Sequence, residues 1–298
     1  MRISIVRLFE ERGVVLFDAA MGTALLAAGQ PNGTGSEEMN LTAPEIVLTV
    51  HLENVNAGSD VVTSNTFGVT QKMMRGETEG ALGIIEIAVG IAKKAAGKGK
   101  RGPEVLTCLG IGPTGAMLGS DEALSYESAL NFFALQAEAG ERAGADFILL
   151  ETFSDAEEFA CAIRGAKNAS RLPVLGTMTF DEGGRSYMGA SLTDMIKVAR
   201  NEGLSATGVN CTLDPECMLP LVSELLGLSG DLPVIAQPNA GQPVYADGKA
   251  VYMTTDEAFA AGAEKLIALG VSGIGGCCGT TPMAISLIRD IIDRRKKI

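Results

Sequence analysis

The sequence has little of what binds nucleic acid or stacks on flat ligands. It contains no tryptophan, four tyrosines in 298 residues, and 24 lysines and arginines against 36 aspartates and glutamates, for a net charge of −12. A surface that binds nucleic acid needs a basic face to meet the phosphates, so this balance argues against DNA and RNA as partners. It argues equally against anionic membranes, and aromatic cages for a cation are scarce.

Long apolar runs are also missing. No segment reaches the roughly 18 apolar residues that a membrane-spanning helix needs. Residues 1–12 carry Glu10, Glu11 and Arg12 after a short apolar stretch, and they lack a convincing signal-peptide core and cleavage site. We therefore expect a cytoplasmic protein. Six cysteines in a cytosolic chain of this size do not indicate a disulfide framework.

Histidine is nearly absent. The chain has one histidine, His51, so a histidine general base or a histidine-rich metal site is effectively excluded. His51 falls in a segment with helix signals, residues 44–56, and we predict a structural role on the outer ring of helices.

Short apolar runs alternate with longer stretches that carry helix signals. The runs are mostly apolar on both faces, as expected of parallel strands covered by helices. They span residues 14–19, 60–66, 104–110, 146–152, 173–180, 206–211, 233–239 and 273–278. Eight strand-then-helix units, with no linker long enough to split the chain, predict one domain: an α/β fold of the (β/α)8 TIM-barrel type over residues 1–298. A doubly wound open sheet is the alternative.

Capping patterns predict where several helices begin. Serine or threonine followed three residues later by glutamate is typical of a helix start. The pattern occurs at Thr42, Ser154 and Thr254, and Thr281 precedes Pro282 at the predicted start of the last helix.

Three cysteines stand at predicted strand ends. Cys211 ends the sixth run, and the adjacent Cys277 and Cys278 end the eighth. The carboxyl ends of barrel strands meet at one mouth, where active sites lie, so we expect these thiols to converge. Three thiolates leave one position of a tetrahedral zinc open, as a catalytic site requires, and soft sulfur favours zinc. Ordinary buried cysteines are the alternative, which the spacing alone leaves open.

The other three cysteines are predicted to be structural. Cys108 lies within a predicted strand and Cys161 in the middle of a predicted helix. Cys217 falls at a predicted helix start, and of these three it is expected to come nearest the mouth.

A zinc ion held by thiolates indicates a particular chemistry. Zinc lowers the pKa of a bound thiol, so that a substrate thiol binds as thiolate near neutral pH. The negative charge of three cysteines keeps that sulfur nucleophilic, which suggests alkyl transfer.

Two carboxylates at strand ends indicate an amino-group site. Asp18 ends the first run and Glu151 the fourth, and either could accept from an ammonium group. The small-residue turn after Asp18 can direct backbone N–H groups at a carboxylate. Together these features favour an amino acid as ligand. The alternatives are a helix-capping aspartate in a tight turn and a helix-start charge at Glu151.

The motifs as a set resemble the homocysteine S-methyltransferase family, and most of all the homocysteine-binding barrel of cobalamin-dependent methionine synthases. The most specific segments are Gly-Val-Asn-Cys at 208–211 and Gly-Gly-Cys-Cys-Gly-Thr-Thr-Pro at 275–282. The other matching segments are 17–23, 60–68, 112–115, 151–155 and 238–241, so the resemblance spans essentially the whole chain.

The resemblance implies a role for each residue of the site. The zinc ligands would be Cys211, Cys277 and Cys278. Asp18 and Glu151 would hold the amino group of homocysteine, and the amides of Ala20, Met21, Gly22 and Thr23 would lie near its carboxylate. Asn239 would occupy the open zinc position until the substrate thiol displaces it.

The methyl donor is the open question. The resemblance is to the barrel alone and covers none of the folate, cobalamin and activation domains of the methionine synthases. Family members that use betaine cage its cation with aromatic rings, whereas this chain has no tryptophan and carries Thr152 where those enzymes have tyrosine. Residues Met283 and Ala284 depart from the family pattern, with consequences expected only for helix packing.

The segment 151–155 is similar to the corrinoid-dependent branch, so we expect methylcobalamin on a separate corrinoid protein. A sulfonium donor such as S-methylmethionine is the alternative. Two further readings are another thiol or a selenol such as selenocysteine as acceptor, and a non-catalytic zinc barrel within a corrinoid assembly.

Overall fold

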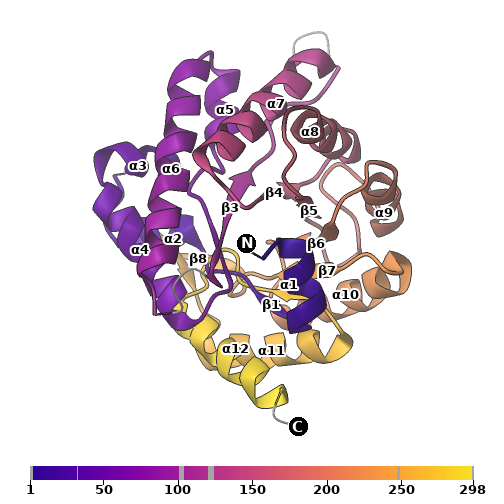
Figure 1. Cartoon of the computed structure of the whole chain (residues 1–298). Coiled ribbons are helices and arrows are strands. Elements are labelled where there is room, and N and C mark those ends of the chain that lie inside the picture. The colour runs from indigo at the N-terminus through magenta and orange to yellow at the C-terminus, as the bar shows by residue number, and fades with distance from the viewer. Residues whose placement is uncertain (1–2, 32, 101–103, 120–123, 247–248, 297–298) are drawn as a thin grey trace.

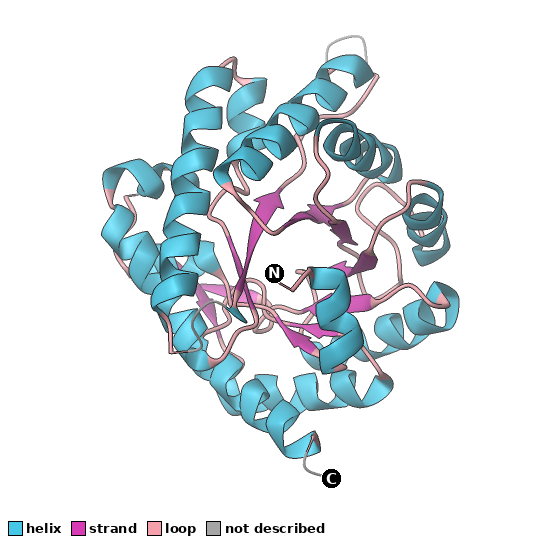
Figure 2. Ribbon diagram, in the orientation of Figure 1, coloured by secondary structure: helices cyan, strands magenta, loops and turns pink. Residues whose placement is uncertain are grey.

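The structure is a nearly closed barrel of parallel strands inside a ring of helices (Figures 1 and 2). The computed structural model describes residues 3–31, 33–100, 104–119, 124–246 and 249–296. The eight barrel strands are β1 (Val15–Leu16), β2 (Val61–Thr63), β3 (Leu106–Ile111), β4 (Phe147–Phe153), β5 (Val174–Met178), β6 (Ala206–Asn210), β7 (Val234–Gln237) and β10 (Gly273–Ile274). Each of the eight predicted runs overlaps one of these strands, with β3 and β4 each ending one residue later than predicted, so the predicted barrel is confirmed.

The strands follow the order β1-β10-β7-β6-β5-β4-β3-β2, and every neighbouring pair is parallel. The first and last strands of this order meet through Asp60. Its N–H donates to the carbonyl of Leu16 (2.7 Å), and its carboxylate accepts from the N–H of Leu16 (2.9 Å). The open sheet considered from the sequence is therefore excluded.

Helices cover the outside and one end of the barrel (Figure 2). They are α1 (Ile5–Arg12), α2 (Met21–Ala27), α3 (Met39–Thr42), α4 (Pro44–Ala57), α5 (Val69–Met74), α6 (Thr78–Lys98), α7 (Tyr126–Ala143), α8 (Ala156–Ala169), α9 (Leu192–Asn201), α10 (Pro215–Ser229), α11 (Asp256–Leu269) and α12 (Pro282–Arg295), with a short 3-10 turn η1 (Ser36–Glu38) before α3. Among the described helices, none has the length and apolarity that crossing a membrane requires.

Helix α1 closes the amino-terminal end of the barrel. Its Ile5, Leu8 and Phe9 are buried in one cluster with interior side chains of the strands, among them Phe17 and Phe147, whose rings meet edge to face at 6.4 Å. Figure 1 shows α1 lying across this end. Apolar side chains therefore fill the barrel interior at this end.

Each predicted helix start lies within one residue of an observed helix start, but only one of the predicted capping residues is the observed cap. Thr281 caps α12 as predicted, since its side chain accepts from the N–H groups of Met283 and Ala284. Asp155 caps α8 and Thr255 caps α11, each one residue after the predicted cap. Thr42 does not cap α4: it ends α3, and its hydroxyl donates to the carbonyl of Glu38.

An unpredicted hairpin follows β7. Strands β8 (Pro243–Ala246) and β9 (Lys249–Tyr252) pair antiparallel, outside the barrel sheet. The ring of Tyr252 lies against Gly279, where a side-chain carbon would come within 2.1 Å of it. The hairpin therefore leans over the segment that carries Cys277 and Cys278.

His51 is buried in α4, and the predicted structural role fits its surroundings. Both ring nitrogens lack a hydrogen-bond partner among the described residues, and burial lowers its pKa from 6.5 to about 4. Between pH 6.5 and 4, His51 therefore binds a proton in the unfolded chain but not in the folded chain. We expect the free energy of unfolding to fall by about 3 kcal/mol between pH 6.5 and 4 from this residue.

The measurement is urea unfolding of the wild type and of His51→Leu across this pH range. The leucine variant should be at least as stable at pH 7, and it should lose that part of the acid sensitivity. An equal loss of stability in both proteins would contradict the assignment.

Candidate metal centre and substrate site

Three thiols converge at the carboxyl end of the barrel. Cys211 directly follows β6, and Cys277 and Cys278 follow β10. Their sulfur atoms all lie within 4.8 Å of one another, with 4.0 Å between Cys211 and Cys278. All three are free and partly buried. The three thiols thus lie close together, as the sequence predicts.

Backbone hydrogen bonds from the end of β7 hold the two cysteine loops together. The N–H of Cys211 donates to the carbonyl of Gln237 (3.0 Å), and the N–H of Cys277 donates to that of Pro238 (2.7 Å). In return, the N–H of Ala240 donates to the carbonyl of Cys278 (2.9 Å). The segment from Gln237 to Ala240 therefore fixes the separation of the thiols.

The backbone at Cys211 is strained. Cys211 and Thr212 have φ of 62° and 59°, in the left-handed region that non-glycine residues rarely adopt. Such conformations persist where the surroundings enforce them and are common at functional sites. Here the turn aims the thiol of Cys211 back toward Cys278.

The cluster fits a metal ion by geometry and by donor type. Tetrahedral zinc with Zn–S bonds of about 2.3 Å places its sulfur ligands about 3.8 Å apart, close to the 4.0 Å seen between Cys211 and Cys278. Asn239, two residues after β7, is buried and its Oδ1 has no hydrogen-bond partner among the described residues. An unpaired buried oxygen is costly, and a cation beside the thiols would satisfy it.

The electrostatics of the cluster also favour a cation. Hydrogen bonds from the other two thiols lower the pKa of Cys211, while the same contacts and burial raise the pKa of Cys277 well above its usual value. One negative charge is therefore easily held by the cluster, and further deprotonation requires a compensating positive charge.

The remaining cysteines lie elsewhere. Cys108 is buried in β3 and Cys161 in α8, where burial raises the pKa of both thiols. Cys217 is exposed in the first turn of α10, the predicted helix start, and its N–H donates to Asp214. None of the three belongs to the sulfur cluster.

Two carboxylates lie beside the thiols, and neither has a cationic partner among the residues that the structure describes. Asp18 is buried after β1 and accepts from the N–H (2.7 Å) and hydroxyl (3.0 Å) of Thr63. Burial raises its pKa to about 7. Burial, with the charges of Asp18 and Cys211, raises the pKa of Glu151 in β4 to about 8. These interactions show that Asp18, Glu151 and Cys211 share one neighbourhood, where an ammonium group would relieve the repulsion.

Glycine makes room for Glu151. A side-chain carbon at Gly110, on the neighbouring strand β3, would come within 2.8 Å of the Glu151 carboxylate. The carboxylate accepts no hydrogen bond from the part of the chain that the structure describes. Its free oxygens can therefore receive a ligand.

The turn after Asp18 opens helix α2. No side chain caps this helix, whose first residues are Met21, Gly22 and Thr23. The N–H of Ala20 already donates to the Thr280 hydroxyl (3.1 Å), and the Thr23 hydroxyl accepts from the N–H of Gly279 (3.3 Å). The helix start is thus tied to the cysteine loop, and the amides of residues 21–23 are the ones left to meet an anion.

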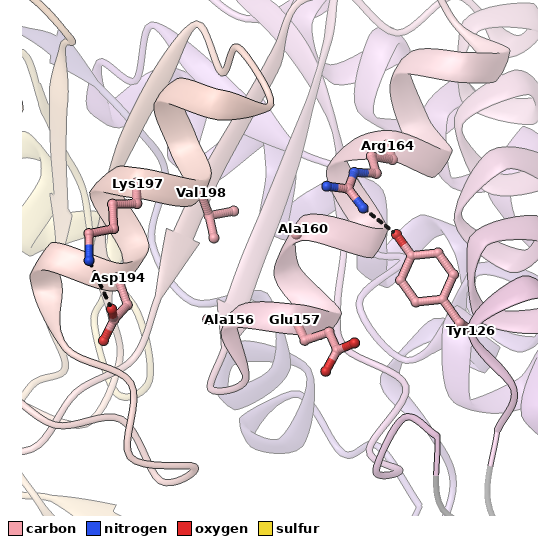
Figure 3. A pocket seen from close by; sticks show the side chains of 8 residues that line it. All are labelled: Tyr126, Ala156, Glu157, Ala160, Arg164, Asp194, Lys197 and Val198. Atoms are coloured by element: carbon pink, nitrogen blue, oxygen red, sulfur yellow. Dashed lines mark hydrogen bonds and ion pairs between the residues drawn. The ribbon is translucent and has the colours of Figure 1, made fainter.

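A hollow of about 400 Å³ on the outer surface lies apart from this site. Figure 3 shows it between α8 and α9, with Arg164 donating to the Tyr126 hydroxyl on one side and Lys197 paired with Asp194 on the other. Arg164 is also ion-paired with Glu202, and no cysteine lines the hollow. It is a groove between neighbouring helices.

Fold and site together define a class: a (β/α)8 barrel with a candidate three-sulfur metal centre at its mouth. The sequence profile described as homocysteine S-methyltransferase matches residues 15–292. The chain belongs to the homocysteine S-methyltransferase family.

Individual relatives agree with this membership. The methionine synthase of Mycobacterium tuberculosis is 31% identical over 291 residues, which cover 91% of this chain and 24% of that protein. The chain thus spans about a quarter of the length of such a synthase. Homocysteine S-methyltransferase 2 of Arabidopsis thaliana is 29% identical, with 86% of this chain and 85% of that protein covered.

Solved structures show the same fold. The homocysteine methyltransferase MmuM of Escherichia coli, in its metallated form, superposes with a TM-score of 0.79 at 24% identity, covering 95% of this chain and 98% of that one. This likeness confirms the barrel architecture.

Proposed function

We propose that the protein is a cytoplasmic, zinc-dependent methyltransferase that transfers a methyl group to the thiol of homocysteine and forms methionine. The observation that carries the proposal is the meeting of three thiols, an unpaired amide oxygen and two carboxylates at one barrel mouth. Family membership supports the reaction class. The metallated form of MmuM supports a metal in a related barrel.

Each residue has a defined part in this proposal. Cys211, Cys277 and Cys278 hold the zinc, which lowers the pKa of a coordinating thiol so that it reacts as thiolate at neutral pH. The Asn239 oxygen, which has no hydrogen-bond partner among the described residues, would serve as a further ligand when no thiol is present. Because the chain needs only to position the sulfur in line with the methyl group, no histidine base is required.

The amino-acid part of the substrate is recognised beside the metal. Asp18 and Glu151 accept from the ammonium group, whose positive charge offsets the cost of holding two buried carboxylates in their ionised form. The amides of Met21, Gly22 and Thr23 receive the carboxylate at the start of α2. Holding both ends of the amino acid places its thiol at the sulfur cluster.

For the donor, we propose a methylcorrinoid carried by a separate protein. Similarity to a methionine synthase supports it. Exposed apolar side chains that follow strand ends also support it, since they offer a partner a surface around the mouth. They are Phe67, Met117, Tyr187, Tyr245, Met253 and Met283. Similarity to a stand-alone plant homocysteine S-methyltransferase keeps a sulfonium donor as the second candidate.

The donor is tested by offering zinc-loaded protein homocysteine with either methylcobalamin or S-methylmethionine and measuring methionine. We expect turnover with methylcobalamin and at least about a tenfold lower rate with S-methylmethionine, a difference of ~1.4 kcal/mol in barrier. Faster turnover with the sulfonium would reverse the donor assignment. Methylation of selenocysteine but not homocysteine would change the acceptor. Homocysteine binding without transfer from either donor would favour a non-catalytic component.

A further inference from the structure

Asn210 is the last residue of β6, directly before Cys211, and only 2% of it is exposed. Its side-chain amide lies between the end of β4 and the sulfur cluster.

The orientation of this amide is fixed by its partners. The backbone N–H of Thr152 can only donate, and it meets Oδ1 of Asn210 at 3.0 Å. The Thr177 hydroxyl donates to the same oxygen at 2.8 Å. The NH2 group must therefore point the other way.

On that other side the NH2 group has two acceptors. One is the Thr152 hydroxyl at 2.6 Å, and the other is the Cys277 sulfur at 3.9 Å. A planar amide has two N–H bonds, so both acceptors can be served at once. All four interactions of the side chain are thus accounted for within the site.

The residue that Asn210 holds is itself strained. Thr152 has φ of 66°, although β-branched residues strongly disfavour this region. It directly follows Glu151, and the ladder between β4 and β5 is irregular between Leu150 and Phe153. Two hydrogen bonds with one amide stabilise this bend: the Thr152 N–H donates to Oδ1, and the Thr152 hydroxyl accepts from the NH2 group.

We propose that Asn210 is a positioning residue that sets both halves of the site at once, by donating to the Cys277 sulfur and by fixing the backbone after Glu151. The inference rests on the proposed metal site. When three thiolates surround one dication, the net charge is −1, and a neutral N–H donor stabilises that charge. Such outer partners orient metal ligands and tune how strongly they donate.

The test uses the full chain loaded with Co²⁺ or Zn²⁺ at pH 8. Asn210→Asp keeps an acceptor for Thr152 and Thr177 but replaces the donor that faces Cys277 with an oxygen. We expect zinc affinity, measured by chelator competition, to fall by about 10–100-fold. The sulfur-to-cobalt charge-transfer band should move to lower energy, because the sulfur no longer shares electron density with an N–H group.

Thr177→Val is the matched control. It removes a buried hydrogen bond from the same amide oxygen without touching the N–H group that faces sulfur. It should lower thermal stability while leaving the cobalt band in place. Asn210→Ala is the second variant, should the aspartate variant fail to fold, and its band should also move to lower energy.

The outcomes separate this inference from the proposed function. A wild-type protein that binds no metal would remove the proposed function and this inference with it. A wild type that binds cobalt through sulfur, with both Asn210 variants unchanged in band energy and zinc affinity, would overturn this inference alone. A shift of equal size in Thr177→Val would assign the effect to general loosening of the network and would also overturn it.

Discussion

Replacing Cys277 with alanine is expected to remove bound zinc and to reduce methionine formation by at least about a thousandfold. Without the metal, a free thiol of pKa about 8.5 is mostly protonated at pH 7. The positioning of sulfur against the methyl group, worth many powers of ten in a well-oriented reaction, is lost with it. Metal analysis of the purified variant and a methionine assay at saturating homocysteine measure both effects.

Cys217→Ala is the control for this substitution. Cys217 is an exposed cysteine outside the sulfur cluster, so its loss should change neither zinc content nor turnover. Cys277→Ala protein that keeps one zinc per chain and normal turnover would show that the reaction does not use the sulfur cluster.

Glu151→Gln is expected to lower kcat/KM for homocysteine by about a hundredfold, ~2.7 kcal/mol, because a charge-assisted contact to the ammonium group is lost. The probe is 4-mercaptobutanoate, which is homocysteine without its amino group. The wild type should prefer homocysteine strongly over this probe, and the variant should have lost most of that preference. Steady-state kinetics with both thiols gives the ratio directly.

The same substitution should not harm the fold. The pKa of Glu151 is raised to about 8 from 4.5, so between these values the folded chain keeps a proton that the unfolded chain releases. Because release of that proton favours the unfolded chain, stability is lost as pH rises from 4.5 to 8, and the amide, which does not titrate, removes that loss. Thermal unfolding at pH 8 should show the variant at least as stable as the wild type.

Glu158→Gln, at another buried glutamate, is the control for the kinetic test and should leave the preference between the two thiols intact. An unchanged preference in Glu151→Gln would exclude the amino-group role.

The sequence was sufficient to predict the barrel and the meeting of the three cysteines at its mouth. Both predictions depend on periodic features: apolar runs that recur along the chain, and chemistry placed where those runs end. The carboxyl ends of parallel strands meet at one mouth regardless of how far apart they are in sequence. Cys211 could thus be paired with Cys277 across more than sixty residues from strand order alone.

Other features depend on contacts that no local pattern encodes. Helix α1 closes the amino-terminal end of the barrel because Ile5 and Leu8 pack against side chains of strands that are spread along the chain. The hairpin β8–β9 is short, and its strands carry no long apolar run. Capping residues were misplaced by one because Asp155 and Thr255 compete with the neighbouring Ser154 and Thr254, and tertiary packing decides which side chain reaches the free N–H groups.

Asn210 shows the same limit within the site itself. The sequence placed it inside a specific four-residue motif without a function for its side chain. Its partners Thr152, Thr177 and Cys277 come from three other segments of the chain. Hydrogen-bond partners of this kind become visible only once the strands are in register.

The proposed function depends on a zinc ion that three cysteines bind and whose fourth position the substrate thiol takes. X-ray absorption of the zinc-loaded protein tests it directly, with and without homocysteine. About one zinc per chain is expected, with three sulfur ligands at ~2.3 Å and one oxygen or nitrogen, changing to four sulfur ligands when homocysteine is added. Failure to retain zinc after reconstitution, or a sulfur count that homocysteine leaves unchanged, would contradict the account.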